Sequence, residues 1–333
     1  MSQPVVLHLV DFHSSNLLMD ELKEKMRKRP MKEFSERFDH LGYLRYVVQD
    51  GVRHNFTALN CVTISQNCHC VCIGDGSKIF FFDLITRNFI TMLPLYATPR
   101  FMLVEENFDK EGNDALFVSY STVIEKYDLK RVLHNEERSL LWKVGNHPNL
   151  RRSLFGVYPP GSGSAVFDVF GLAILYEKKG NLLLTCGQVM KVMSTVDGSV
   201  MDGYEFKENE PSQPIFAEFF QNQLIVLQQV EYHRYQFKVF NRVSEHVWKF
   251  EKILFGNHVF RDVTGFTIDQ IREKCILTNQ SSISIIPMKG EDPPISTFLN
   301  GGQLDGVRGL CMDSRRGHLH VADSGHNAVQ SFK

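Results

Sequence analysis

The fold is decided by a six-residue pattern, V-x-G-[LF]-x-[IM], which the chain repeats at VFGLAI (169–174), VTGFTI (263–268) and VRGLCM (307–312). Each copy is followed by a polar turn and a second short apolar run. Short runs rich in Val, Ile, Phe and Leu, bounded by Gly, Asn and Asp, predict β-strands. Internal copies of a strand pair at a regular spacing predict a repeat architecture.

Weaker copies of the pattern extend the repeat toward the N-terminus. They can be anchored near Leu59, Phe101 and Pro214. The six anchors then lie at 59, 101, 171, 214, 265 and 309, with separations of 42, 70, 43, 51 and 44 positions. A four-stranded sheet with tight turns needs about 40 to 50 residues, the length of a propeller blade. The spacing therefore predicts an all-β, six-bladed β-propeller in which one unit carries an insertion at 145–168.

A second marker gives the same period. Phe82-Asp83-Leu84 and Tyr127-Asp128-Leu129 lie 45 positions apart, each at the end of a predicted strand. They stand where a seven-bladed WD40-like propeller would carry its tryptophan-aspartate dipeptides, which are absent from this chain. A seven-bladed ring that uses the N-terminal segment is therefore the alternative architecture.

The segment ahead of the repeats is predicted to be helical. Ser14 and Ser15 are suitable N-cap residues, Leu18, Leu22 and Met26 recur at i+4, and Pro30 ends this first helix. A second short helix fits the spacing of Met31, Phe34, Phe38 and Leu41. Residues 1–42 are accordingly expected to form a helical N-terminal extension of the propeller.

The last predicted unit is one strand short, because only three strands fit between its anchor and Lys333. An open ring would leave unpaired strand edges. Residues 44–48 (LRYVV) have the length and pattern of the missing strand. We therefore predict a propeller over residues 43–333 in which strand 44–48 pairs with the final blade and closes the ring.

Composition limits the compartment and the partner. The 333 residues include 37 Lys and Arg and 38 Asp and Glu, and the net charge of -1 provides no global attraction for polyanions. The seven cysteines form no CxxC pair, and no secretory signal is evident. Reduced thiols in the cytoplasm, or else in the nucleus, are expected. No apolar stretch approaches the roughly 20 residues of a membrane span.

The most specific motif lies in the last unit. VRGLCMD (307–313) and GHLHVADSGHNAVQSF (317–332) resemble the NHL repeat, whose pattern runs roughly from P-x-G-[IV]-A-V-D through G-N-[IL]-Y-V-A-D-S-G-N-H-R-I-Q-V-F. The resemblance implies a recognition surface, since NHL propellers bind either RNA or proteins. A related group of six-bladed propellers are metal-dependent lactonases or lyases. The chain lacks the paired Cys and His spacings of a RING or B-box domain.

Candidate binding residues lie at the predicted rim. Arg100 and Arg308 occupy the same repeat position, one residue before the anchor, so both are expected on one face, where guanidinium groups bind phosphate or carboxylate. The insertion enlarges this rim and adds Arg151, Arg152 and Tyr158. Within the insertion, 161–164 (GSGS) predicts a flexible surface loop or an engineered linker.

A basic run in the predicted N-terminal helix is the second candidate. Its central residues are Lys25, Arg27, Lys28 and Arg29. Such a run is typical of a nuclear-localisation or nucleic-acid patch, but also of the solvated face of an amphipathic helix. Acidic residues flank the run on both sides, which favours the solvated face.

Two groups of residues resemble metal ligands. Cys68, Cys70 and Cys72 alternate on one strand near Cys61, a spacing that suits core filling better than zinc binding. The other group consists of His318, His320, Asp323 and His326. It belongs to a single blade, whereas a metal-dependent propeller enzyme draws its ligands from several blades. No metal site, cofactor or catalytic residue is therefore predicted.

Together these features predict a non-catalytic interaction scaffold in the cytoplasm. A protein is the first candidate partner, and RNA, in post-transcriptional regulation, is the second. A membrane or a small-molecule substrate is not expected. The alternative function is a metal-dependent propeller hydrolase or lyase, for which carboxylate, Asn or His side chains would have to converge on the central channel.

Overall fold

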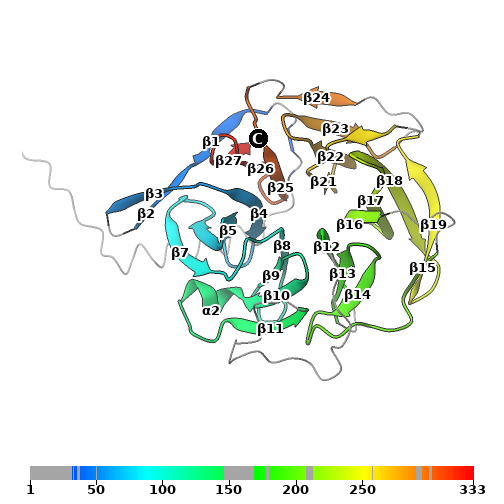
Figure 1. The fold of residues 1–333 in the computed structure, drawn as a ribbon, viewed down its shortest axis with the longest axis horizontal. Coiled ribbons are helices and arrows are strands. Elements are labelled where there is room, and N and C mark those ends of the chain that lie inside the picture. Colours follow the sequence, from blue (N-terminus) through cyan, green and yellow to red (C-terminus); the bar gives the residue numbers. More distant parts are fainter. Residues whose placement is uncertain are drawn as a thin grey trace, which may run out of the picture.

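The chain folds into a six-bladed β-propeller, in which six sheets stand radially around a central axis (Figure 1). The computed structural model describes residues 32, 34–35, 38–49, 51–145, 169–177, 180–207, 213–256, 258–289, 295–299 and 302–333. The predicted six-bladed architecture is confirmed, and the seven-bladed alternative is wrong. We name the sheets blades A to F in chain order.

The first three blades follow one another along the chain. Blade A consists of β4 (Leu59–Ser65), β5 (Cys70–Asp75), β6 (Lys78–Asp83) and β7 (Phe89–Pro94). Blade B consists of β8 (Phe101–Glu105), β9 (Ala115–Ser119), β10 (Val123–Asp128) and β11 (Leu140–Gly145). Blade C has three strands, β12 (Gly171–Leu175), β13 (Leu182–Cys186) and β14 (Lys191–Ser194).

The remaining blades complete the ring. Blade D consists of β16 (Gln213–Phe220), β17 (Gln223–Glu231), β18 (Arg234–Arg242) and β19 (Val247–Leu254), joined by β15 (Glu205–Lys207) and β20 (Phe260–Arg261). Blade E consists of β21 (Gly265–Asp269), β22 (Lys274–Thr278), β23 (Ile283–Pro287) and β24 (Ser296–Phe298). Blade F contains β25 (Val307–Asp313), β26 (His318–Asp323) and β27 (Ala328–Phe332). Each of the six sequence anchors lies in the first strand of its blade.

The N-terminal segment closes the ring, but four residues earlier than predicted. The closing strand is β1 (His40–Leu44), which pairs antiparallel with β27, so that Leu44 lies opposite Val329. Strand 44–48 is therefore wrong except for its first residue. The residues after Leu44 instead form a separate hairpin of β2 (Tyr46–Gln49) and β3 (Val52–Asn55).

Hydrogen bonds next to β1 account for this register. The Asp39 N–H donates to the Lys333 carbonyl at 3.1 Å, and the Lys333 N–H donates back to Asp39 at 3.0 Å. Ahead of this pair, Phe34 and Phe38 are buried beside Phe298 and Phe332. These side chains position residues 40–44 along the edge of blade F, which determines the strand that pairs there.

The predicted second helix is wrong where the structure describes it. Phe34 and Phe38 lie in irregular backbone, and Leu41 belongs to β1. The two phenylalanines contact each other edge to face, with ring centres 5.1 Å apart. Burial between two blades outweighs the helical spacing of these residues. The first predicted helix lies outside the described residues.

The aspartates of the second sequence marker, Asp83 and Asp128, cap the backbone that follows their strands. The Asp83 carboxylate accepts hydrogen bonds from the N–H groups of Ile85 and Thr86, at 2.9 and 2.7 Å. Asp128 caps the N-terminus of α2 (Leu129–Leu133) through the Arg131 N–H at 3.1 Å. Both aspartates satisfy backbone donors where a strand ends.

The hydrophobic core is divided among the contacts between neighbouring blades. Six clusters of buried side chains occupy the six seams, one between each adjacent pair. At the seam between blades D and E, for example, Phe237 packs against Phe266 with ring centres 5.0 Å apart. Each blade therefore depends on both neighbours for burial, as expected for a closed repeat.

The glycine of the sequence pattern allows the first strands to approach one another. A Cβ added to Gly171 would lie 2.5 Å from the carbonyl oxygen of Ile215 in the first strand of blade D. A Cβ on Gly265 would lie 2.8 Å from Leu310 of blade F, and a Cβ on Gly309 would lie 3.4 Å from Cys61 of blade A. Each glycine thus abuts the next blade around the axis.

Candidate functional site: the central channel

The first strands of all six blades surround a central channel, which is the main candidate site. Its cavity has a volume of about 360 Å³ and is lined by residues of β4, β8, β12, β16, β21 and β25. This volume lies within the range of small-ligand pockets. Most lining side chains are apolar, among them Met102, Leu172 and Leu310.

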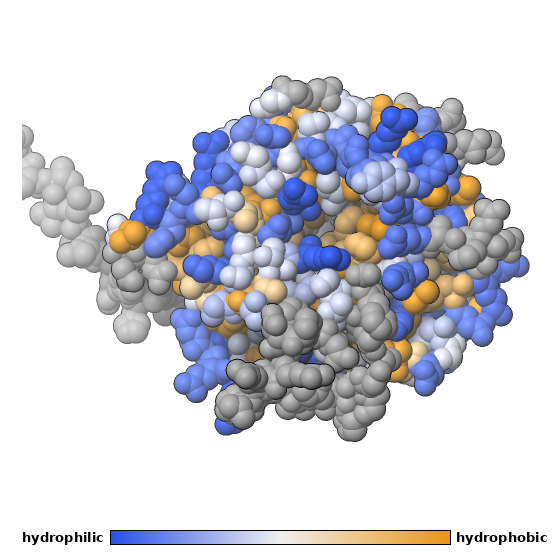
Figure 2. Space-filling view, in the orientation of Figure 1, coloured by the Kyte–Doolittle hydropathy of each residue, from blue (hydrophilic) through white to orange (hydrophobic). Residues whose placement is uncertain are grey.

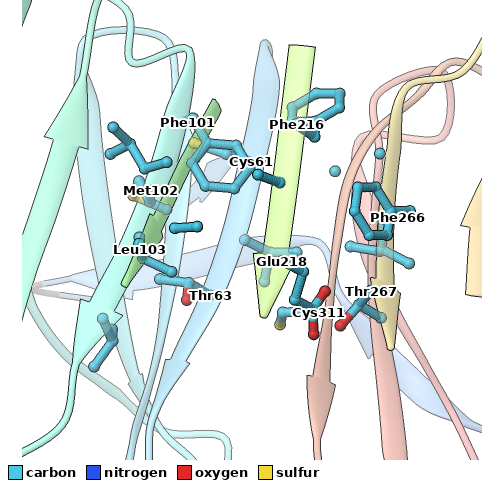
Figure 3. Close-up of a pocket in the computed structure, with 18 of the residues that line it drawn as sticks. Cys61, Thr63, Phe101, Met102, Leu103, Phe216, Glu218, Phe266, Thr267 and Cys311 are labelled. Atoms are coloured by element: carbon cyan, nitrogen blue, oxygen red, sulfur yellow. The ribbon is translucent and has the colours of Figure 1, made fainter. Parts of the chain in front are cut away.

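Aromatic side chains contribute to the lining of the channel. Figure 3 shows Phe101, Phe216 and Phe266 on three different first strands, with Phe266 lower in the view than the other two. The rings of Phe101 and Phe216 have centres 5.7 Å apart. All three are partly exposed. They therefore offer apolar faces against which an apolar side chain can pack.

A single carboxyl group lies deeper in the channel. Glu218 belongs to β16, and its carboxyl oxygens accept hydrogen bonds from the Ile268 N–H of β21 at 3.1 and 3.2 Å (Figure 3). Burial raises the pKa of Glu218 to about 8, although the hydrogen bonds from Ile268 and the Thr267 side chain act in the opposite direction. The carboxyl group is therefore mostly protonated at neutral pH.

Two arginines lie where the first strands begin. Arg100 immediately precedes β8, Arg308 is the second residue of β25, and both are exposed and line the channel. The Arg100 guanidinium lies 5.5 Å from the centre of the Phe170 ring. With Glu218 mostly neutral, these two arginines supply the net charge of the described lining residues, which is positive. Their role in binding remains a prediction.

The surface around the channel is mixed in character. Figure 2 shows one face of the ring, on which strongly hydrophilic side chains and hydrophobic ones meet near the centre, over the first strands of the blades. Polar rims around apolar pockets are typical of binding sites. The arrangement suits a ligand that carries both a charged and an apolar group.

The other predicted binding residues lie outside the described part of the chain. These are Arg151, Arg152 and Tyr158 of the insertion, and Lys25, Arg27, Lys28 and Arg29 of the basic run. The structure therefore brings together Arg100 and Arg308 and does not place the remaining candidates.

The cysteines mostly fill the core, as predicted. Cys61, Cys70 and Cys72 are buried in the cluster between blades A and B, with the sulfur atoms of Cys70 and Cys72 3.9 Å apart. All seven cysteines are free thiols. Burial raises the pKa of the Cys61 thiol to about 12, so this channel-lining thiol remains neutral.

Two polar residues were missed in the sequence. Glu218 stands alone among apolar residues in the stretch IFAEFF (215–220), a signal that could have identified it. Asp313 was also missed: it lies opposite His318 across the hairpin of β25 and β26. His326 Nδ1 pairs with the Asp323 carboxylate at 2.7 Å, whereas His318 and His320 lie with Asp313 in a separate cluster.

Comparison with known proteins identifies the fold and leaves the family open. No protein-family model and no curated protein matches the sequence. Among solved structures, 1187 chains match, so the fold is widespread and does not select a function. The crystal structure of Chaetomium thermophilum Raptor matches with a TM-score of 0.57 and 12% identity, over 98% of this chain and 36% of that chain. This chain thus spans about a third of Raptor, and the likeness concerns the fold alone.

The described part of the chain has no helix that is long and apolar enough to cross a membrane. Its one regular helix, α2, has five residues.

Proposed function

We propose that this propeller is a protein-recognition module whose partner binds at the mouth of the central channel. The observation that carries this proposal is the combination of an apolar, partly aromatic cavity with two exposed arginines where it begins. An acidic group of the partner would pair with Arg100 and Arg308 while a neighbouring apolar side chain enters the channel beside Phe101 and Phe216. Charge-assisted pairs of arginine with carboxylate supply orientation, and apolar burial supplies affinity.

The lining of the channel favours binding over metal-dependent catalysis. Its described residues include one carboxyl group, Glu218, and no histidine or asparagine. A catalytic zinc site typically uses three protein ligands around the metal. A single carboxyl group that is mostly protonated at neutral pH does not supply the ligands of such a site. The hydrolase or lyase alternative would therefore need ligands from outside the described residues.

A selection from a random peptide library on the full chain tests the proposal. We expect the selected peptides to carry Asp or Glu next to a large apolar residue. The Arg100→Ala, Arg308→Ala double variant should weaken their binding at least tenfold in isothermal titration calorimetry. Arg261→Ala is the matched control, because Arg261 is exposed on β20, outside the channel. Equal affinity of the double variant and the control would refute the proposed site.

A labelled single-stranded RNA in the same assay tests the second candidate partner. Binding to RNA should weaken steeply as salt rises, and the double arginine variant should reduce that slope. If RNA binds tightly and in a salt-sensitive way, and no peptide is selected, RNA becomes the proposed partner in place of a protein.

The cytoplasm is the compartment we propose for this activity, with the nucleus second. Seven free thiols, several of them deeply buried, suit a reducing environment. Finding the endogenous protein in a secreted fraction, with its cysteines oxidised, would contradict this part of the proposal.

A further inference from the structure

A cluster of metal-ligating side chains lies away from the channel, at the seam between blades F and A. Asp313 ends β25, and His318 and His320 lie on the neighbouring strand β26. His318 is directly opposite Asp313, and His320 follows two positions later on the same face of the strand. One potential ligand atom from each residue lies within 4.8 Å of the others.

The side chains of this cluster have unsatisfied polar atoms. Asp313 and His320 are fully buried, yet Asp313 Oδ2, His318 Nδ1 and His320 Nε2 lack a hydrogen-bond partner among the described residues. A buried polar atom left unpaired costs about 1–3 kcal/mol. Asp313 Oδ2 forms an ion pair with Arg316 Nε at 3.5 Å but accepts no hydrogen bond from the described residues. A ligand bound between the three side chains would satisfy all three atoms.

The remaining atoms of the two buried residues are held in place. His320 Nδ1 lies 2.8 Å from Ser331 Oγ on β27, which orients the ring and leaves Nε2 available. Asp313 Oδ1 accepts hydrogen bonds from Gln66 Nε2 at 3.0 Å and from the Arg316 N–H at 3.1 Å, which leaves Oδ2 available. Such secondary contacts are what orient ligands at known metal sites.

Blade E shows that the propeller fold does not require this cluster. Its first strand also ends in an aspartate, Asp269, but Lys274 lies opposite it and Ile276 takes the place of His320. In blade E the oxygen that corresponds to Asp313 Oδ2 has a hydrogen-bond partner: Asp269 Oδ2 accepts a hydrogen bond from the Phe34 N–H at 3.1 Å. The two histidines are therefore particular to blade F in this pair.

We propose that Asp313, His318 and His320 bind a divalent transition metal ion of the class that prefers imidazole ligands, such as Zn²⁺. Two imidazoles and one carboxylate form a recurrent metal-binding set that leaves positions open for further ligands. Ligand atoms on a tetrahedral Zn²⁺ lie roughly 3.4 Å apart, and the potential ligand atoms here lie within 4.8 Å of one another.

Two arginines lie beside the cluster. Arg316 Nε lies 3.5 Å from Asp313 Oδ2, and the Arg87 side chain donates to Ser331 Oγ at 3.4 Å. Their positive charge opposes any divalent cation, so binding here would depend on the two imidazole donors, which suit Zn²⁺ better than Mg²⁺ or Ca²⁺. Because Gln66 and Arg87 belong to the blade A side of the seam, the ion would strengthen the contact at which the ring closes.

Direct metal binding tests the proposal. The purified full chain, treated with chelator and then titrated with Zn²⁺, should bind one ion per molecule and unfold at a higher temperature. His318→Ala should weaken binding at least tenfold, whereas His54→Ala, which removes an exposed histidine on β3, should leave it unchanged. Circular dichroism without metal establishes that each variant is folded. Absence of bound Zn²⁺, or equal affinity of His318→Ala and the unaltered chain, would overturn the site.

Cobalt substitution tests the ligand types without any variant. Co²⁺ bound by two imidazoles and a carboxylate should show visible ligand-field bands and no thiolate-to-cobalt charge-transfer band. A strong charge-transfer band would assign the metal to one or more of the seven free cysteines instead and would overturn the proposed ligand set.

Discussion

Blades E and F begin with the same six-residue pattern, but they are completed in different ways. Blade E is built from one continuous stretch, β21 to β24. Blade F takes three strands from the C-terminal end of the chain and its fourth, β1, from residues about 290 positions earlier. The repeat in the sequence therefore specifies three strands of a blade, and the outermost strand is free to come from elsewhere.

The two blades also differ in how their seams are filled. The seam between E and F contains Phe34 and Phe38 from the N-terminal segment, in contact with Phe298 of blade E and Phe332 of blade F. The seam between F and A contains the polar cluster around Asp313. A hydrophobic cluster that includes Leu44, Val47 and Val329 also fills the seam between F and A. Blade F is therefore held by apolar burial on both sides, and the polar cluster is an addition on the side of blade A.

Removal of the closing strand should have the largest effect on this comparison. Deletion of residues 1–44 removes β1, Phe34 and Phe38, and leaves the edge of β27 unpaired. Loss of one buried phenylalanine costs about 3–5 kcal/mol, and the deletion removes two together with a strand. We expect a loss of more than about 5 kcal/mol, comparable to the whole stability of a typical domain. Thermal unfolding followed by circular dichroism measures this.

Deletion of residues 1–31 is the matched control for that experiment. It retains Phe34, Phe38 and β1, so the described contacts of blade F persist. We expect a melting temperature close to that of the full chain. Equal melting temperatures for the two deletions would show that the closing strand does not stabilise blade F.

The sequence predicts the strands within each blade better than it predicts the contacts that join the two ends of the chain. The anchors at Gly171, Gly265 and Gly309 mark first strands correctly because strand length and turn spacing are local properties of the chain. The closing strand was misplaced because its register depends on Asp39 meeting Lys333, nearly 300 positions away. Helical spacing between Phe34 and Phe38 was misleading for a related reason, since both side chains are held by blades that are distant in sequence.

The candidate site was predicted only in part, for a similar reason. Arg100 and Arg308 could be placed together, because equivalent positions of a repeat share a face. Glu218 could not be recognised as a protonated acid, because its environment depends on β21 of the neighbouring blade. Asp313 was not associated with His318 because the pairing depends on the register of a hairpin. The shared location of side chains at equivalent repeat positions was predictable, and contacts between side chains of different strands were not.

The pattern glycines offer a more graded test of how the blades meet. Ala at position 171 would bring its Cβ within 2.5 Å of a backbone oxygen in the next first strand, whereas Ala at position 309 would make contacts of 3.4 Å. Backbone cannot move aside as a side chain end can. We expect Gly171→Ala to cost about 1–3 kcal/mol, and Gly309→Ala to cost clearly less. Urea unfolding of the two variants measures the difference, and equal costs would contradict the role assigned to the close approach.

The last expected effect concerns a carboxyl group that links blade D to blade E. Glu218 of blade D accepts hydrogen bonds from Ile268 in the first strand of blade E. Its pKa is raised from 4.5 to about 8 by burial in the folded chain. Between these two values the folded state retains a proton that the unfolded state has lost. The contribution of Glu218 to the free energy of unfolding is therefore fully present below about pH 4.5 and falls as pH rises toward 8.

Glu218→Gln should remove this part of the pH dependence. The glutamine cannot ionise, so the variant should gain stability relative to the unaltered chain as pH rises from 5 to 9. The neighbouring Cys275 thiol does not interfere, because burial raises its pKa well above the usual value and keeps it neutral. Urea unfolding of both proteins at several pH values measures the effect. Parallel curves for the two proteins would mean that Glu218 ionises normally, and the channel would then carry a negative charge opposite Arg100 and Arg308 at neutral pH.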